Sequence, residues 1–140
     1  MIAMLLDTNV LSELARPRPN RTVTAFLDSE ISAHISVVTL HELVFGARRV
    51  SDPLKRQRLL DWIGSIENQY QSSLIPVSRE IARTAADFRA DQQHHGRVLH
   101  IEDALIAATA AVYSLTLVTR NTRDFESIDV QLINPWKPKS

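Results

Sequence analysis

The sequence predicts an α/β domain in three layers, with helices on both faces of a mostly parallel central sheet. Three observations support this prediction. Short aliphatic runs alternate along the chain with longer segments whose apolar residues recur at helical spacing. The first run stops abruptly at polar residues that can begin a helix. Strands that alternate with helices in this way are typical of a parallel, doubly wound sheet.

The composition predicts one soluble domain over residues 1–140. The chain is 44% hydrophobic and 23% charged, which is ordinary for a globular protein. It contains no cysteine, so disulfides and cysteine-ligated metals are excluded, and we expect a cytoplasmic protein. Asp7 interrupts the first apolar stretch, so we expect no signal peptide. The longest apolar run, residues 104–113, is shorter than the roughly 20 residues that span a bilayer, so we expect no membrane association.

The zero net charge argues against a large non-specific nucleic-acid surface. If several acids are committed to one site, however, the remaining surface carries a surplus of positive charge. Arginine dominates these cations, and its planar group suits phosphate and carboxylate partners.

The first residues predict a buried strand over 2–6 and a helix over 10–14, with Asn9 as its cap. A basic loop with two prolines follows at residues 16–21. This loop is either a solvated connector or an arm that contacts phosphate or a partner. The spacing then predicts a helix over residues 22–29.

A second strand is predicted over residues 33–37. Thr39 and Glu42 follow with the spacing of a capping box. Asp52-Pro53 predicts the start of a long amphipathic helix, because a cap followed by a first-turn proline is a common helix start. Residues 39–70 are therefore predicted to form a helical hairpin, on which a second copy of the chain could dock.

The remaining chain predicts three more strands, over residues 74–77, 115–119 and 130–133. Ser78 is expected to cap the helix that follows the first of them. A further helix, opened by residues 101–103 and apolar nearly all round, is expected in the centre of the fold. Residues 134–140 form a polar C-terminal tail.

Four acids occupy the same kind of position, just after a strand or in the first turn of a helix: Asp7, Glu42, Asp103 and Asp124. Each alone is explained by the helix dipole or a cap. In a parallel sheet, however, helix N-termini gather at the carboxyl ends of the strands, so the acids can converge. Converging carboxylates repel one another unless a cation intervenes. An all-oxygen ligand set selects Mg²⁺ or Mn²⁺, which suits metal-assisted phosphoryl chemistry.

Two other kinds of acidic site on parallel sheets do not fit the sequence. A haloacid-dehalogenase-type phosphatase needs Asp-x-Asp after the first strand, but here Asn9 takes the place of the second acid. A phosphoacceptor receiver domain needs a lysine on a late strand. Neither kind of site has the lysine that it requires, because no lysine lies between Lys55 and Lys137. With three glycines in the chain, a phosphate-binding glycine loop is also excluded.

Taken together, these motifs resemble PIN-domain nucleases, and more narrowly the VapC toxins of bacterial VapBC toxin–antitoxin modules. The resemblance extends over essentially the whole chain. The Asn-Pro-Trp sequence near the end and the Arg-Pro loop after the first helix are similar to the FitB-like branch. The matching stretches are LLDTNVLS at residues 5–12, Glu42 after a strand, DALIAA at 103–108 and LVTRNTRDF at 117–125.

The resemblance implies a metal site with defined roles. Asp7 and Asp103 would be the principal Mg²⁺ ligands, with Mn²⁺ as a substitute, and Glu42 would be a third acid of the pocket. Some relatives carry an acid at the position of Asn121, so the fourth acid is either replaced there or supplied by Asp124, which we favour. The resemblance further implies substrate or supporting contacts from the polar residues around these acids, Asn9, Thr119, Arg120 and Asn121.

The same resemblance implies a toxic endoribonuclease of a type II toxin–antitoxin system, which hydrolyses RNA with Mg²⁺. It also implies a homodimer inhibited by a VapB-type antitoxin, with DNA contacted only through that antitoxin. The main alternative is a catalytically inactive PIN-like scaffold that binds RNA or protein. A phosphomonoesterase with the same metal pocket is a third hypothesis.

Overall fold

The structure is a computed structural model that describes residues 2–29 and 31–137, and its centre is a sheet of five parallel strands. The predicted tail therefore lies partly outside the described residues, which end at 137. The strand order is β3-β2-β1-β4-β5, so the first strand lies in the middle of the sheet. The strands are β1 (Ile2–Leu6), β2 (Ile31–Ser36), β3 (Leu74–Ile75), β4 (Thr116–Val118) and β5 (Leu132–Ile133).

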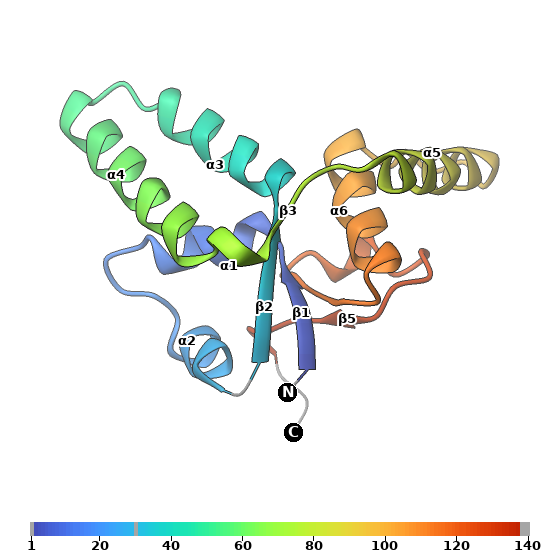
Figure 1. Cartoon of the computed structure of the whole chain (residues 1–140), viewed down its shortest axis with the longest axis horizontal. Helices are drawn as coiled ribbons and strands as arrows, with labels where there is room; N and C mark the ends of the chain where they lie inside the picture. Colours follow the sequence, from blue (N-terminus) through green and yellow to red (C-terminus); the bar gives the residue numbers. More distant parts are fainter. Residues whose placement is uncertain (1, 30, 138–140) are drawn as a thin grey trace.

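Helices cover both faces of this sheet, which confirms the predicted three-layer fold (Figure 1). Helices α1 to α4 pack on one face, and α5 and α6 pack on the other. The helices are α1 (Thr8–Leu14), α2 (Arg21–Asp28), α3 (Val37–Arg48), α4 (Pro53–Gln69), α5 (Arg79–His94) and α6 (Ile101–Val112). Two short 3₁₀ turns, η1 (Gln71–Ser73) and η2 (Thr122–Asp124), complete the chain.

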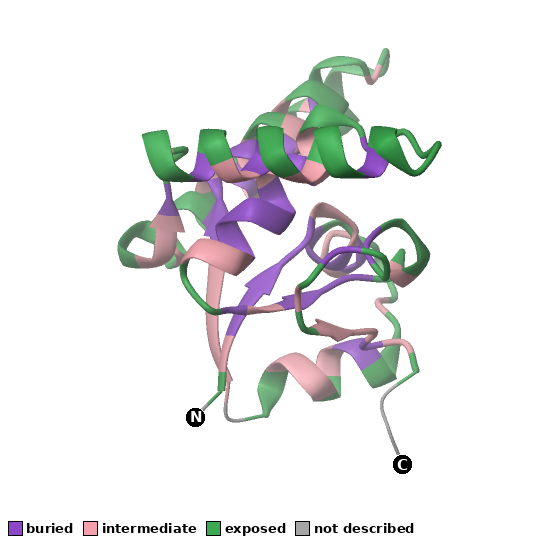
Figure 2. Cartoon of the chain, turned by 90° about the vertical axis from the view of Figure 1, so that its right-hand side faces the viewer, coloured by how far each residue is buried: buried purple, intermediate pink, exposed green. Residues whose placement is uncertain are grey.

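Alternation along β1 divides the core between the two faces. Met4 and Leu6 pack with α1 to α4, while Leu5 packs with α5 and α6. All three side chains are buried, and each leucine contributes about 1.5–3 kcal/mol on burial. Figure 2 shows the buried segments between the exposed outer surfaces of the helices. Helix α6 lies in the core, as its composition predicted, and most of its buried side chains are alanines.

The helix starts differ from the prediction at two places. Asp7, not Asn9, caps α1, because the Asp7 carboxylate accepts the Thr8 N–H. Helix α3 begins earlier than predicted, with Ser36 as its cap, so Thr39 and Glu42 form no capping box. In both cases the predicted cap residue makes tertiary contacts instead. The predicted caps Asp52 and Ser78 are confirmed.

The strands are confirmed, but their bounds shift. β2 begins at Ile31 and ends at Ser36, because Val37 already belongs to α3. β3 has two residues rather than four, and Pro76, which has no N–H for a ladder, follows it directly. At the carboxyl edge of the sheet, the ends of β1, β2 and β4 lie next to one another, because these strands are adjacent and parallel.

Helices α3 and α4 pack against each other across the short connection at residues 49–52, in the region predicted as a helical hairpin. Its role as a dimer surface stays a prediction. Among the described residues, no helix combines the length and apolar character needed to cross a bilayer.

Candidate active site

Asp7 lies at the end of β1 and is buried, with 5% of its surface exposed. Its Oδ2 accepts the Thr119 hydroxyl at 2.8 Å and the Asn9 amide at 3.3 Å, and its Oδ1 accepts the Thr8 N–H at 2.8 Å. Burial raises the pKa of Asp7, and these hydrogen bonds oppose the rise because they favour the carboxylate. The neighbouring strand therefore fixes the orientation of this carboxyl group.

Glu42 reaches the same place from α3. Its Oε1 accepts the Thr8 hydroxyl at 2.7 Å. Partial burial raises the pKa of Glu42, the Thr8 hydrogen bond lowers it, and the negative charge of Asp7 adds to the rise. Glu42 therefore contacts α1 and does not take part in the capping box that the sequence predicted.

Asp103 enters from the first turn of α6, on the other side of the sheet. Burial raises its pKa from 3.8 to about 6, and the charges of Asp7, Asp124 and Glu42 reinforce the shift. Three elements that are distant in sequence therefore bring carboxylates into one electrostatic field.

These acids lie on a cleft of about 560 Å³. The cleft also carries two arginines and one tryptophan, so acids on its walls face cations on its rim. Its lining residues are Asp7, Thr8, Asn9, Ser12, Glu13, Arg16, Glu42, Asp103, Arg120, Asn121 and Trp136.

Asp124 faces a neighbouring hollow of about 330 Å³, which it shares with Asp103. Its charge still acts on both Asp7 and Asp103. Asn121 lines the acidic cleft itself, and its N–H donates to the Thr119 hydroxyl oxygen at 3.1 Å. The structure thus brings together every predicted site residue except Asp124, with Thr119 buried behind Asp7. The role of Asp124 stays a prediction.

Comparison with known proteins establishes the family. Residues 4–131 match the PIN domain. The chain belongs to the PIN-domain family. Similar proteins include Toxin FitB of Neisseria gonorrhoeae, which is 38% identical over 95% of this chain and 98% of its own length. VapC ribonuclease Y4jK of Sinorhizobium fredii is 33% identical over 96% of this chain and 99% of its own.

Solved structures share the fold of this PIN domain over nearly its full length. FitAcB from Neisseria gonorrhoeae superposes with a TM-score of 0.88 at 38% identity, and the match covers 95% of this chain and 98% of that one. VapBC-5 from Mycobacterium tuberculosis, a member of the VapBC family of toxin-antitoxin systems, has a TM-score of 0.74 at 28% identity and covers 96% and 99%.

The donor set of this PIN domain suits a hard cation. In the part of the chain that the structure describes, no three His, Asp or Glu side chains form a ready-made ligand set for one ion. Magnesium does not require one, because it usually keeps several waters and binds one or two carboxylates. Asp7 and Asp103 line one cleft, and the charge of Asp7 raises the pKa of Asp103, so the two carboxylates fit that requirement.

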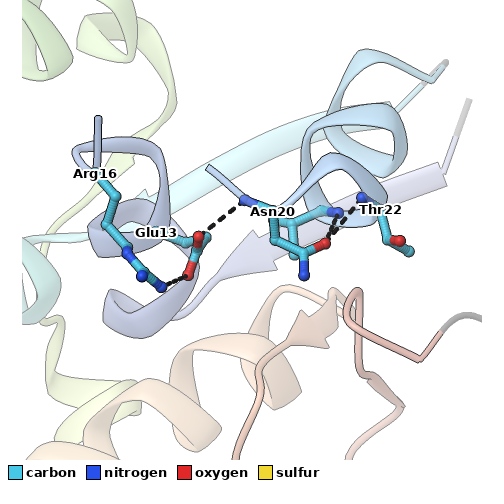
Figure 3. A network of polar contacts seen from close by, with 5 residues as sticks. Glu13, Arg16, Asn20 and Thr22 are labelled. Atoms are coloured by element: carbon cyan, nitrogen blue, oxygen red, sulfur yellow. Dashed lines mark hydrogen bonds and ion pairs between the residues drawn. The ribbon is translucent and has the colours of Figure 1, made fainter. Parts of the chain in front are cut away.

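The sequence prediction missed several residues of the cleft, most notably Glu13. This residue is also 5% exposed, and its carboxylate accepts the Asn20 N–H at 2.9 Å and the Arg16 guanidinium at 3.2 Å (Figure 3). The Asn20 hydrogen bond lowers the pKa of Glu13. Asn9 and Glu13 are four residues apart, which was the available signal that they share one side of α1. Arg16 follows just after the helix.

We predict that Asp103→Asn stabilises the metal-free protein at neutral pH. The folded state holds the Asp103 proton more tightly than the unfolded chain does, since its pKa rises from 3.8 to about 6. The free energy of unfolding therefore falls as pH rises through this interval, and asparagine removes the loss. After solvent screening, the gain at about pH 7.5 is on the order of 1 kcal/mol.

Thermal unfolding with a chelator, at about pH 4.5 and about pH 7.5, measures this difference. Asp87→Asn on the exposed side of α5 is the matched control and is expected to leave the pH dependence unchanged. A variant at Asp103 that keeps the wild-type pH dependence would contradict the prediction.

Proposed function

We propose that this PIN domain is a toxic endoribonuclease that hydrolyses RNA phosphodiester bonds with Mg²⁺, and that a cognate antitoxin inhibits it in the cytoplasm. The convergence of Asp7, Glu42 and Asp103 on one cleft carries the proposal. Relatives named as a toxin and as a VapC ribonuclease support it. The arginines on the cleft rim suit a polyanionic substrate.

Asp7 and Asp103 are the side chains that would hold Mg²⁺, or Mn²⁺ in its place. When bound, the ion would activate water and neutralise charge on the phosphate oxygens. Thr119 and Thr8 keep the Asp7 carboxylate in one orientation, and their hydrogen bonds oppose the rise in its pKa that burial causes. Asp124 would add negative field from the adjoining hollow.

The chain's own groups also account for the proton and for the phosphate. Glu42 has a raised pKa and is positioned by Thr8, which suits it to accept a proton from the attacking water. The water oxygen bonds to phosphorus while the bond from phosphorus to the 3′ oxygen breaks, and that oxygen takes up a proton. Arg16 and Arg120 would bind the flanking phosphates. The products are a 3′-hydroxyl and a 5′-phosphate.

We predict that Asp103→Asn and Asp7→Asn each lower Mg²⁺-dependent RNA cleavage by about 100-fold or more, the loss typical of removing a charge that acts in the transition state. The measurement is cleavage of single-stranded RNA by purified protein, with Asp87→Asn as a surface control. Undiminished cleavage by a folded Asp103→Asn variant would sink the proposal. Wild-type protein that binds RNA but never cleaves it would instead support the scaffold alternative.

An antitoxin of the VapB type is the proposed partner, with DNA contacted only through it. The similarity to a toxin and to a member of a toxin-antitoxin family supports this pairing. We predict that expression of this chain alone arrests growth, and that co-expression of a small DNA-binding protein encoded next to its gene restores growth. Growth arrest that persists with every adjacent small protein would contradict the pairing.

We also propose a homodimer in which the exposed face of α3 contacts a second copy. This face combines Val37, Leu40 and Val44 with Phe45, which is 55% exposed. We predict that light scattering gives a dimer for the wild type and a monomer for Phe45→Ser, because the substitution removes exposed apolar area. The control is Val98→Ser, which removes an exposed apolar side chain outside α3 and is expected to stay dimeric. A monomeric wild type would contradict the assignment.

A further inference from the structure

Arg120 and Trp136 form a stacked pair on the wall of the acidic cleft. The Arg120 guanidinium carbon lies 4.9 Å from the centre of the Trp136 ring. Arg120 leaves the sheet just after β4, whereas Trp136 follows β5, and both line the cleft that contains Asp7 and Asp103. The pair therefore adjoins the place proposed for bond cleavage.

The backbone on both sides of this pair is held in place. The Arg120 N–H donates to the Asn9 side-chain oxygen at 3.1 Å, and the Arg120 carbonyl accepts the Asn134 amide at 3.5 Å. The other end of the Asn134 side chain accepts the Trp136 N–H at 2.9 Å. Asn9 also contacts Asp7, so the stacked pair is fixed relative to the buried acid. Such a fixed pair loses little conformational entropy when it binds a ligand.

The hydrogen-bonding edge of Arg120 is not used within the described chain. Four acids line the cleft. The ion pairs among the described residues nevertheless join Arg16 with Glu13 and His95 with Asp91, and none involves Arg120. The side chain is exposed, while Trp136 is half-buried against the core cluster below it. The guanidinium lies over the indole ring, and its N–H groups have no hydrogen-bond acceptor among the described residues and are open to a ligand.

We propose that Arg120, backed by Trp136, is a platform that stacks an unpaired nucleobase and binds the phosphate beside the scissile bond. The guanidinium plane is able to stack on a base while its N–H groups donate to phosphate oxygens. Trp136 acts through Arg120 as a positioning residue, because it holds the guanidinium plane. This inference rests on the proposed nuclease function, and it adds a requirement for single-stranded RNA at one nucleotide.

The test compares Arg120→Lys, which keeps the charge but loses the plane, with Trp136→Leu and Trp136→Phe. The probe is a labelled single-stranded RNA of about 12 nucleotides, a length within known single-strand site sizes. Stacking of one base is worth about 5- to 100-fold in binding, so Arg120→Lys and Trp136→Leu should raise KM by that range with kcat nearly unchanged. Trp136→Phe should recover most of the loss. Arg58→Lys, an exposed arginine on α4, is the matched control.

Two further measurements separate stacking from charge alone. A set of RNAs with one base removed at each position in turn should show one position where wild-type affinity falls and the Arg120→Lys affinity does not. In a Trp62→Phe background, Trp136 is the remaining tryptophan, and its emission should change on RNA binding. Unfolding curves confirm that each variant is folded.

Wild-type KM in folded Arg120→Lys and Trp136→Leu variants, with no base-removal effect, would overturn the platform while leaving the nuclease proposal intact. Conversely, wild-type protein that shows the base-removal effect in binding but cleaves no RNA would sink the nuclease proposal and keep the platform. Equal binding of intact and base-removed RNAs at every position would reduce Arg120 to a phosphate contact and also overturn the inference.

Discussion

The hydrogen bond between the Thr119 hydroxyl and the Asp7 carboxylate joins distant parts of the chain at the middle of the sheet, and the candidate site is built around it. It exists because β1 and β4 are neighbours in the sheet, and the Asp7 N–H also donates to the Val118 carbonyl at 2.9 Å. Without this pairing, Asp7 would be a buried carboxylate with fewer hydrogen-bond donors, and its burial would lower the stability of the fold. With it, the acid is oriented by hydrogen bonds that favour its charged form, and it still lines the cleft.

Collecting carboxylates has an electrostatic cost that the rest of the fold must offset. Asp7, Glu42 and Asp103 all have raised pKa values, and the neighbouring acids contribute to each rise. The buried alanine face of α6 holds Asp103 against this repulsion, because close packing fixes the helix on the sheet. When no cation is bound, the repulsion among these carboxylates lowers the free energy of unfolding. A cation that binds the folded protein raises it.

The sequence predicted the layers, the parallel sheet and the convergence of three acids, because these follow from periodicity and from the geometry of parallel strands. It failed where a side chain had to choose between a local and a tertiary partner. Asn9 and Thr39 have the residue types of caps, but Asp7 and Ser36 take those roles. Glu13 was missed because its burial depends on the loop that folds back to donate the Asn20 N–H. Asp124, expected from the resemblance as the fourth acid, stays a prediction, and the 3₁₀ turn η2 places it in the hollow that it shares with Asp103.

The connection between β1 and β4 also has a consequence for the timing of synthesis. The cleft combines Asp7 near the start of the chain with Arg120 and Trp136 near its end, and Thr119 supports Asp7 from β4's exit. A ribosome releases these parts in order, so the nascent chain carries an incomplete cleft until β4 and β5 have emerged and paired. For a protein proposed to cut RNA, this order means that the complete cleft forms only after β5 has been synthesised.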